Sequence, residues 1–437
     1  MGKLSLAVII LFAGAATLAR PWIGICSYYL LAILGPQYIW WWNFEGLRVS
    51  LIVASCTLLG LVFQSGKKKY DILFLSNSLN FWMVVLWFFI VASYFLGPYV
   101  DLFHSSGLRP SQIFSITNTI FFFYFCSSFE INKVYKIRFL SIIFAASTIY
   151  LTYWANNQYL SQNWYQFNMG RLMGPYDIYG SSIYKDENTF AMFFVTGLPF
   201  VYYLGFGLSK KWQRITLWLV IPLSWHAIFL TGSRGGLVGL GVIMLCIAFL
   251  SNRKILAIPL LLLFLVFYQW QAGTEMKTRS ERIANYEGEG SAEMRIAAWT
   301  GGLRMILDHP ILGVGLGSFA TALPDYYDTN PRVAHNTFIQ FAAESGIMAG
   351  IAYIVIVCLF FLQFRKIRIW CHNHGGDHES RQIELYNNAS FVSFLGLVVC
   401  SLFLSLNTYE TFFVLLIFNN ALFTICSKKM TLICKYA

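Results

Sequence analysis

Apolar runs of helix length recur along this chain and constrain its fold more than any other feature. Only 12% of the 437 residues are charged, against about 25% in an average soluble domain, and 57% are hydrophobic. Runs of this length are typical of helices that cross a membrane. The pattern therefore predicts an all-α polytopic membrane protein that forms a single membrane domain over residues 1–437. The runs fall near 48 to 64, 78 to 96, 111 to 129, 137 to 154, 187 to 207, 212 to 230, 235 to 250, 254 to 271, 336 to 363, 388 to 406 and 410 to 426.

Short basic segments separate many of these runs. They are Lys67 to Lys69; Lys133, Lys136 and Arg138; Lys210, Lys211 and Arg214; Arg253 and Lys254; Arg365, Lys366, Arg368 and Arg381; and Lys428, Lys429 and Lys435. The positive-inside rule assigns them to the cytoplasm, and the orientation then alternates without contradiction. The net charge of +11 thus reflects topology, and we expect no nucleic-acid partner.

The same alternation assigns the remaining polar segments. A cytoplasmic loop is expected over 364–387. The segments expected outside are 36 to 47, 97 to 110, 155 to 185, 231 to 234 and 272 to 334. Of these, 155–185 is a smaller periplasmic loop and 272–334 a large one.

The N-terminal stretch Leu4 to Leu34 is too long for one ordinary span, and Arg20-Pro21 interrupts it. It is either two short spans with an outer N-terminus, or one interrupted, partly re-entrant unit with Lys3 inside. We favour about twelve spans with both chain ends in the cytoplasm.

The large outer segment is expected to contain helices. Ser291 is suited to cap a helix that runs to Asp308-His309-Pro310, and the glycines of GVGLG then make a turn. Met294, Ala298 and Met305 share one side of this helix, which predicts that it lies against the membrane.

Arg234 lies in the sequence TGSRGG at an outer turn between two apolar runs. A charge at this depth is costly unless it has a partner or a function, and a guanidinium is suited to bidentate phosphate binding. Arg234 is therefore either an arginine that snorkels at a helix end or an anchor for a lipid phosphate or diphosphate.

His335 lies where the large outer segment meets the next apolar run. Its imidazole titrates near neutrality, which suits a general base that takes a proton from a sugar hydroxyl. The alternative is a local hydrogen bond at a helix start. Asn336 is a residue that orients His335 or starts the helix. Glu344 is nine residues away, on the opposite side of a straight helix, so we expect Glu344 and Gly346 to serve packing or capping.

Further outer cations are available to neutralise a diphosphate, although each alone is more typical of a surface charge. They are Arg171, Arg282, Arg295 and Arg332. Asp186-Glu187 is a possible metal ligand pair, but no second outer acidic pair accompanies it, so no metal is expected.

Two further patterns suggest chemistry less strongly. Gly313, Gly315 and Gly317 resemble a phosphate loop only loosely and are expected to form a turn. A cluster of metal-ligand residue types lies on the cytoplasmic side and is expected to be a solvated loop. Its members are Cys371, His372, His374 and His378.

Four motifs follow one another between Thr231 and Gly350: TGSRGGLVGL, an R-x3-W pair (Arg295 and Trp299), DHPILGVGLGSF and HNTFIQFAAESGIMAG. This series resembles the bacterial O-antigen ligase and O-antigen polymerase family of multispanning membrane glycosyltransferases. Each motif alone is weak, but their order and spacing make the resemblance fairly specific. The opening ARPWIGICSYYLLAILGPQYIWW also resembles members identified as O-glycosylation ligases.

The resemblance implies a C-type glycosyltransferase-like fold in the bacterial inner membrane, with a large periplasmic loop over a cavity open to lipid. Members take a glycan from an undecaprenyl diphosphate carrier and pass it to an acceptor hydroxyl. The acceptor is lipid A core for ligases, another carrier-linked repeat for polymerases, and a protein side chain for O-oligosaccharyltransferases. The family does not generally rely on a metal, so no cofactor is expected.

On the matching positions, Arg234 corresponds to the family's essential arginine and His335 to its loop-end histidine, while Arg282 is a candidate for an additional loop arginine. We therefore expect an inverting transfer with His335 and Arg234 as catalytic residues, and we favour the ligase. Substrate contacts are expected from Arg282, Arg171, Arg295, Asn336 and Arg332. The alternatives from other classes are a transporter, which requires polar residues deep in several spans, and a non-catalytic scaffold.

Overall fold

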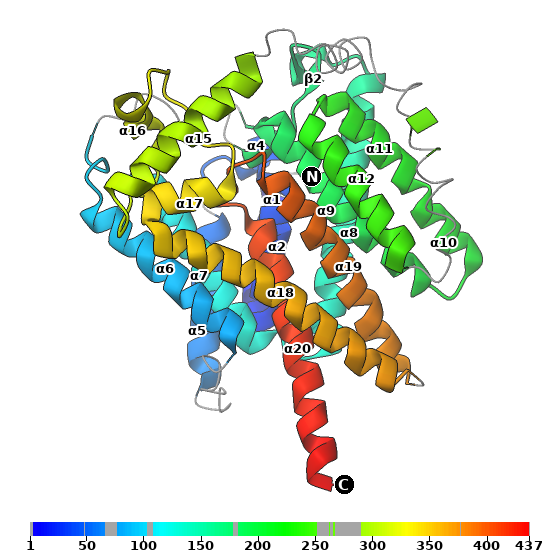
Figure 1. The fold of residues 1–437 in the computed structure, drawn as a ribbon. Helices are drawn as coiled ribbons and strands as arrows, with labels where there is room; N and C mark the ends of the chain where they lie inside the picture. The colour runs from blue at the N-terminus through cyan, green and yellow to red at the C-terminus, as the bar shows by residue number, and fades with distance from the viewer. Residues whose placement is uncertain are drawn as a thin grey trace.

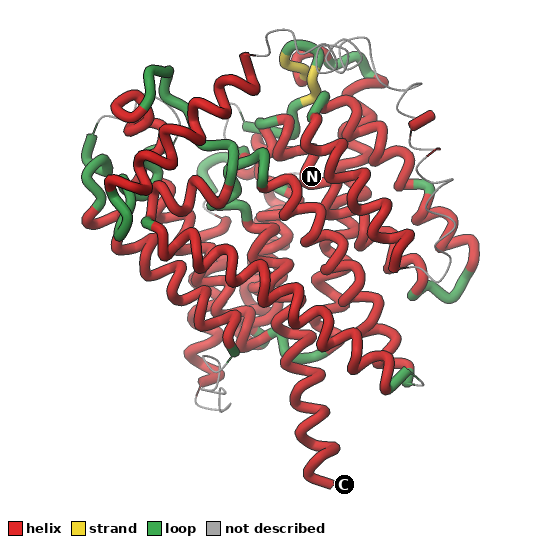
Figure 2. The backbone as a smooth tube through the Cα atoms, in the orientation of Figure 1, coloured by secondary structure: helices red, strands yellow, loops and turns green. Residues whose placement is uncertain are grey.

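The computed structural model describes residues 3–47, 49–65, 77–102, 108–177, 182–250, 262, 265–266, 290–375 and 377–436. Helices form nearly all of its regular structure (Figures 1 and 2). Within these ranges the strands are β1 (Phe167–Asn168) and β2 (Arg171–Leu172), which pair antiparallel in one small hairpin. This architecture confirms an all-α polytopic membrane protein. Arg282 and most of the predicted run 254 to 271 lie outside the described residues.

The N-terminal stretch forms two short helices, α1 (Lys3–Ala19) and α2 (Pro21–Leu34), which meet at Arg20. Pro21 occupies the first position of α2, where its missing N–H costs nothing. The short helices α3 (Pro36–Ile39) and α4 (Trp41–Phe44) lead to α5 (Val49–Ser65), which packs against both α1 and α2. The break expected at Arg20-Pro21 is therefore confirmed.

Seven helices in the described ranges are long and apolar enough to cross a membrane. They are α6 (Ser78–Leu96), α8 (Val134–Leu160), α9 (Glu187–Phe206), the pair α10 (Lys211–Trp218) and α11 (Val220–Thr231), α18 (Ile347–Asn373), α19 (His378–Ser401) and α20 (Glu410–Tyr436). Shorter apolar helices α1, α2, α5 and α12 (Arg234–Leu250) accompany them, together with α7 (Pro110–Glu130). Helix α9 is the centre of the bundle, since α8, α10, α11, α12 and α19 all pack against it.

The structure corrects two of the predicted boundaries. The run 336 to 363 is divided at Gly346 into α17 (Thr337–Ser345) and α18, because Gly346 has φ +86° and a Cβ there would overlap the Ile311 carbonyl. The segment 364–387, expected to be a loop, is mainly helix: α18 continues to Asn373 and α19 begins at His378.

Helices α15 (Gly290–Asp308), α16 (Phe319–Tyr326) and α17 form a small cluster above the bundle (Figure 1). The predicted helix ending at Asp308 is confirmed as α15. Of the three residues predicted to face the membrane, Met294 is exposed (41%), but Ala298 and Met305 are not. Both side chains are fully buried against Phe319 and Ile339, because the turn after α15 folds α16 and α17 back over that side.

The segments predicted to lie outside gather at one end of the bundle. Tyr99 donates its backbone N–H to Val314 (3.0 Å) and its hydroxyl to Asp325 (2.9 Å). Gly97 approaches Gly315 so closely that a Cβ would lie 2.3 Å from its Cα. Gly313, Gly315 and Gly317 all have positive φ, which confirms that they form a turn. The other end of the bundle carries the basic N-terminus of α8 and the ends of α9, α10 and α19.

Candidate functional site

His335 has an unusual backbone conformation, with φ +49° in the left-handed region. The residues on either side hold it there. Ala334 donates its N–H to Gln340 Oε1 (2.9 Å) and accepts from Trp299 Nε1 (2.9 Å) at its carbonyl. Asn336 caps α17 through a bond from the Ile339 N–H (3.1 Å) to its side-chain oxygen. The capping alternative for Asn336 is therefore confirmed, and His335 lies on a backbone fixed from both sides.

The imidazole of His335 is half-buried and has no hydrogen-bond partner within the described residues. Burial lowers its pKa from the ordinary 6.5, and the positive charges of Arg295 and Arg332 lower it further. Asp186 opposes this shift with a smaller effect than that of Arg295. The side chain is consequently neutral at neutral pH and suited to accept a proton.

Gln340 and Glu344 connect the His335 backbone to the glycine turn. Gln340 Nε2 donates to the buried Glu344 carboxylate (2.7 Å), which also accepts from the Phe319 N–H (3.3 Å). Burial raises the pKa of Glu344 to about 7. Ser405 donates to Gln340 Oε1 (2.9 Å). Glu344 thus serves the packing role expected for it.

Arg234 begins α12 directly after a tight turn. Ser233 caps the helix by accepting the Gly236 N–H (3.1 Å), and Gly232 has φ +61°. The side chain of Arg171 lies across this turn, since a Cβ on Gly232 would be 2.9 Å from its Cγ. Glycine is therefore required at position 232 for both its backbone angle and its close contact.

Arg171 forms an ion pair with Glu187 in the first turn of α9, and both side chains are largely buried. Asp186 caps the same helix by accepting from the Thr189 N–H (2.8 Å). The two acidic residues considered as metal ligands are therefore engaged in protein contacts. Among the described residues, no three His, Cys, Asp or Glu side chains form a group that could bind a metal ion.

The loop between α19 and α20 contacts both the segment that carries His335 and the segment that carries Arg234. Thr337 donates its hydroxyl to the Leu404 carbonyl (2.7 Å), while Phe403 packs on Gly235, beside Arg234. The apolar runs alone do not predict this loop. Its signal in the sequence is the segment SLNTYE (405–410), which spans the break between the apolar runs 388 to 406 and 410 to 426.

A family model described as O-antigen ligase matches residues 215–354, a range that contains both Arg234 and His335. This match supports a membrane protein of the O-antigen ligase and polymerase family. A second model, of a family of unknown function, matches residues 1–102. No curated protein in the comparison matches the chain. The match to the O-antigen ligase model supports a glycosyltransferase-like enzyme with glycan and lipid substrates.

The predicted site residues fall into three groups. The positive charges of Arg295 and Arg332 lower the pKa of His335. Arg295 lies one helical turn from Trp299, whose indole N–H donates to the Ala334 carbonyl. Arg171 packs on the turn before Arg234. The third group is Arg282 alone, outside the described residues.

Proposed function

We propose that this protein transfers a glycan from an undecaprenyl diphosphate carrier to an acceptor hydroxyl at the periplasmic face, with lipid A core as the favoured acceptor. The observation that carries the proposal is the half-buried imidazole of His335, held on a fixed backbone near Arg295 and Arg332, whose charges lower its pKa. The transfer inverts the anomeric centre and uses no metal.

His335 takes the proton of the acceptor hydroxyl as its oxygen forms a bond to the anomeric carbon of the donor sugar. The bond from that carbon to the diphosphate oxygen breaks at the same time, and the electron pair leaves with undecaprenyl diphosphate. The lowered pKa of His335 supports this role, because it keeps the proton-accepting form present at neutral pH.

Arginines stabilise the charge that develops on the leaving diphosphate. Arg234 is assigned this role together with Arg295 or Arg332, and Arg282 is a further candidate. Arg171 is assigned to positioning, since its ion pair with Glu187 and its contact with Gly232 support the turn that carries Arg234.

The test supplies purified protein with carrier-linked glycan and either lipid A core or additional carrier-linked glycan. We expect the lipid A core to become glycosylated, with His335→Ala inactive and His309→Ala, another outer-loop histidine, active. Extension of the carrier-linked glycan instead identifies a polymerase. If the His335→Ala variant still forms its product, the assignment of His335 as the base is refuted.

A further inference from the structure

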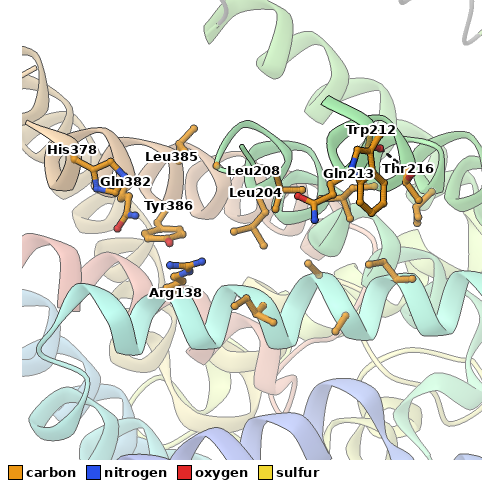
Figure 3. Close-up of a pocket in the computed structure, with 17 residues that line it drawn as sticks. Arg138, Leu204, Leu208, Trp212, Gln213, Thr216, His378, Gln382, Leu385 and Tyr386 are labelled. Atoms are coloured by element: carbon orange, nitrogen blue, oxygen red, sulfur yellow. Dashed lines mark hydrogen bonds between the residues drawn. The ribbon is translucent and has the colours of Figure 1, made fainter. Parts of the chain in front are cut away.

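A cavity of about 650 Å³ is drawn in Figure 3. The helix ends that form it lie at the opposite end of the bundle from His335. Its walls are α8, the end of α9, α10 with the start of α11, and the first turns of α19. Its volume is in the range of about 300–1,000 Å³ that is usual for ligand pockets. The cavity contains none of the residues assigned to glycan transfer.

Four polar side chains of this cavity gather at one end. Figure 3 shows Arg138, His378, Gln382 and Tyr386 close together. The last three are spaced four residues apart on α19, so they share one side of that helix. No acidic residue lines the cavity, and Arg138 makes no ion pair within the described part of the chain. This end can therefore donate hydrogen bonds and positive charge to an anion.

The rest of the cavity is largely apolar, apart from Gln213 and Thr216 of α10. Along α8 its lining continues from Arg138 through Ile142 and Ala146 to Ile149, and Trp212 closes the other side. The distance from Arg138 to Ile149 along the helix is about 16 Å at 1.5 Å per residue. This is close to half of the roughly 30 Å hydrocarbon core, which is the depth of one leaflet.

The cavity faces lipid along its length. The side chains of Ile142 and Trp212 are exposed on the outside of the protein (45% and 63%). Both lie in helices apolar enough to cross a membrane, so this exposed side faces lipid. The basic start of α8 is assigned to the cytoplasm by the positive-inside rule, so the polar end of the cavity lies at the headgroup level of the inner leaflet. Basic pockets between membrane helices on this side are suited to anionic lipid headgroups.

We propose that this cavity binds an anionic glycerophospholipid of the cytoplasmic leaflet. Its phosphate lies at Arg138, with Gln382 and Tyr386 as hydrogen-bond donors. One acyl chain lies along the α8 face from Ile142 to Ile149. The proposal is independent of glycan transfer, which is assigned to the opposite end of the bundle.

The test measures lipid binding to the purified, delipidated full chain. Phosphatidylglycerol or phosphatidylcholine is titrated in, and retained lipid is counted by native mass spectrometry, with thermal stabilisation as a second readout. We expect preferential retention of phosphatidylglycerol. Arg138→Gln should weaken that binding about fivefold, the effect of about one cationic contact at a membrane surface. Ala146→Trp, which fills the apolar part, should reduce retention of both lipids.

Lys133→Gln is the matched control, because Lys133 is an exposed cation at the same end of α8 that does not line the cavity. Its binding should equal that of the unmodified protein. Equal losses in Lys133→Gln and Arg138→Gln, or equal retention of the two lipids, would each overturn the proposal. Gln382→Leu provides a second polar-end variant, with weaker phosphatidylglycerol binding expected.

Discussion

The His335 site and the cavity at Arg138 differ in how far their central polar groups are held by other residues of the protein. Helices α9 and α19 run between the two ends of the bundle. Helix α9 begins at Glu187 near the His335 site and ends at Phe206 near the lipid-facing cavity. Helix α19 runs the other way, from His378 near the cavity to Ser401 near the His335 site. Around His335, backbone and side chains are tied to partners within the protein. Around Arg138, the cation is open to an outside ligand.

This difference matches the demands of the two proposed roles. A proton transfer requires a base held in one geometry, and a residue at positive φ stays there only where its surroundings compensate a cost of about 1–3 kcal/mol. The bonds to Ala334 and the cap at Asn336 provide that support for His335. A lipid headgroup is mobile, and it is accommodated by an arginine that is free to follow it.

The largest effect is expected from His335→Ala. Removal of a general base lowers turnover by about 10²–10⁴-fold, so transfer should fall by at least 100-fold. The protein should remain folded, since the imidazole has no hydrogen-bond partner within the described residues. Rates of glycan transfer with matched amounts of membrane protein provide the measurement. Near-normal turnover would show that His335 is not the base, and the proposed difference between the two ends of the bundle would then not hold.

Arg234→Lys should produce the next largest effect. Lysine keeps the charge but loses the paired N–H groups that bind a diphosphate, so we expect turnover to fall about 100-fold. Arg304→Lys is the control, because Arg304 is an exposed arginine of α15 that donates to the Tyr326 carbonyl (2.7 Å). Equal activity in the two variants would exclude diphosphate binding by Arg234.

Gln340→Leu tests whether the fixed backbone matters. The variant leaves the buried Ala334 N–H without its partner and should lower turnover about 10- to 100-fold, with KM little changed. Steady-state kinetics separate the two parameters. Gln363→Leu removes another buried glutamine, which donates to Asn77 (3.0 Å) away from the site. That control should lose stability without the loss of turnover; equal turnover in both would contradict a positioning role for Gln340.

The smallest expected change is in pH dependence. Burial and Arg295 lower the pKa of His335, so its neutral form persists to lower pH and the acid limb of the activity profile should lie below pH 6.5. Arg295→Gln removes a positive charge, which raises the pKa of His335. The acid limb should therefore move to higher pH in the variant. A pH–rate profile measures the shift, and a limb that stays in place or moves to lower pH would contradict the electrostatic role of Arg295.

Much of the fold follows from local sequence. The apolar runs predicted most of the helices, and the Arg20-Pro21 pair predicted the break between α1 and α2. Gly346 shows where local pattern fails. An apolar run continues across it, and its positive φ is required by the approach of the Ile311 carbonyl, a contact from a distant part of the chain.

In the candidate site, too, some features follow from local sequence and others depend on contacts between distant segments. Residue type and position selected Arg234 and His335, because a guanidinium and an imidazole are chemically distinctive beside a membrane. Nothing local in the sequence identifies Gln340 or the loop at Leu404 as their supports, since the bonds from Ala334 and Thr337 depend on how α17 packs against neighbouring segments.

The sequence by itself determined a multispan helical protein and the residues capable of chemistry, because hydrophobic length and side-chain type are local properties. Only the tertiary structure decided that Arg171 pairs with Glu187 and that Ala298 packs inward. It alone placed Arg138 and Gln382, 244 positions apart in the sequence, in one cavity. These outcomes depend on which helix faces meet, and that is set by the packing of the whole bundle.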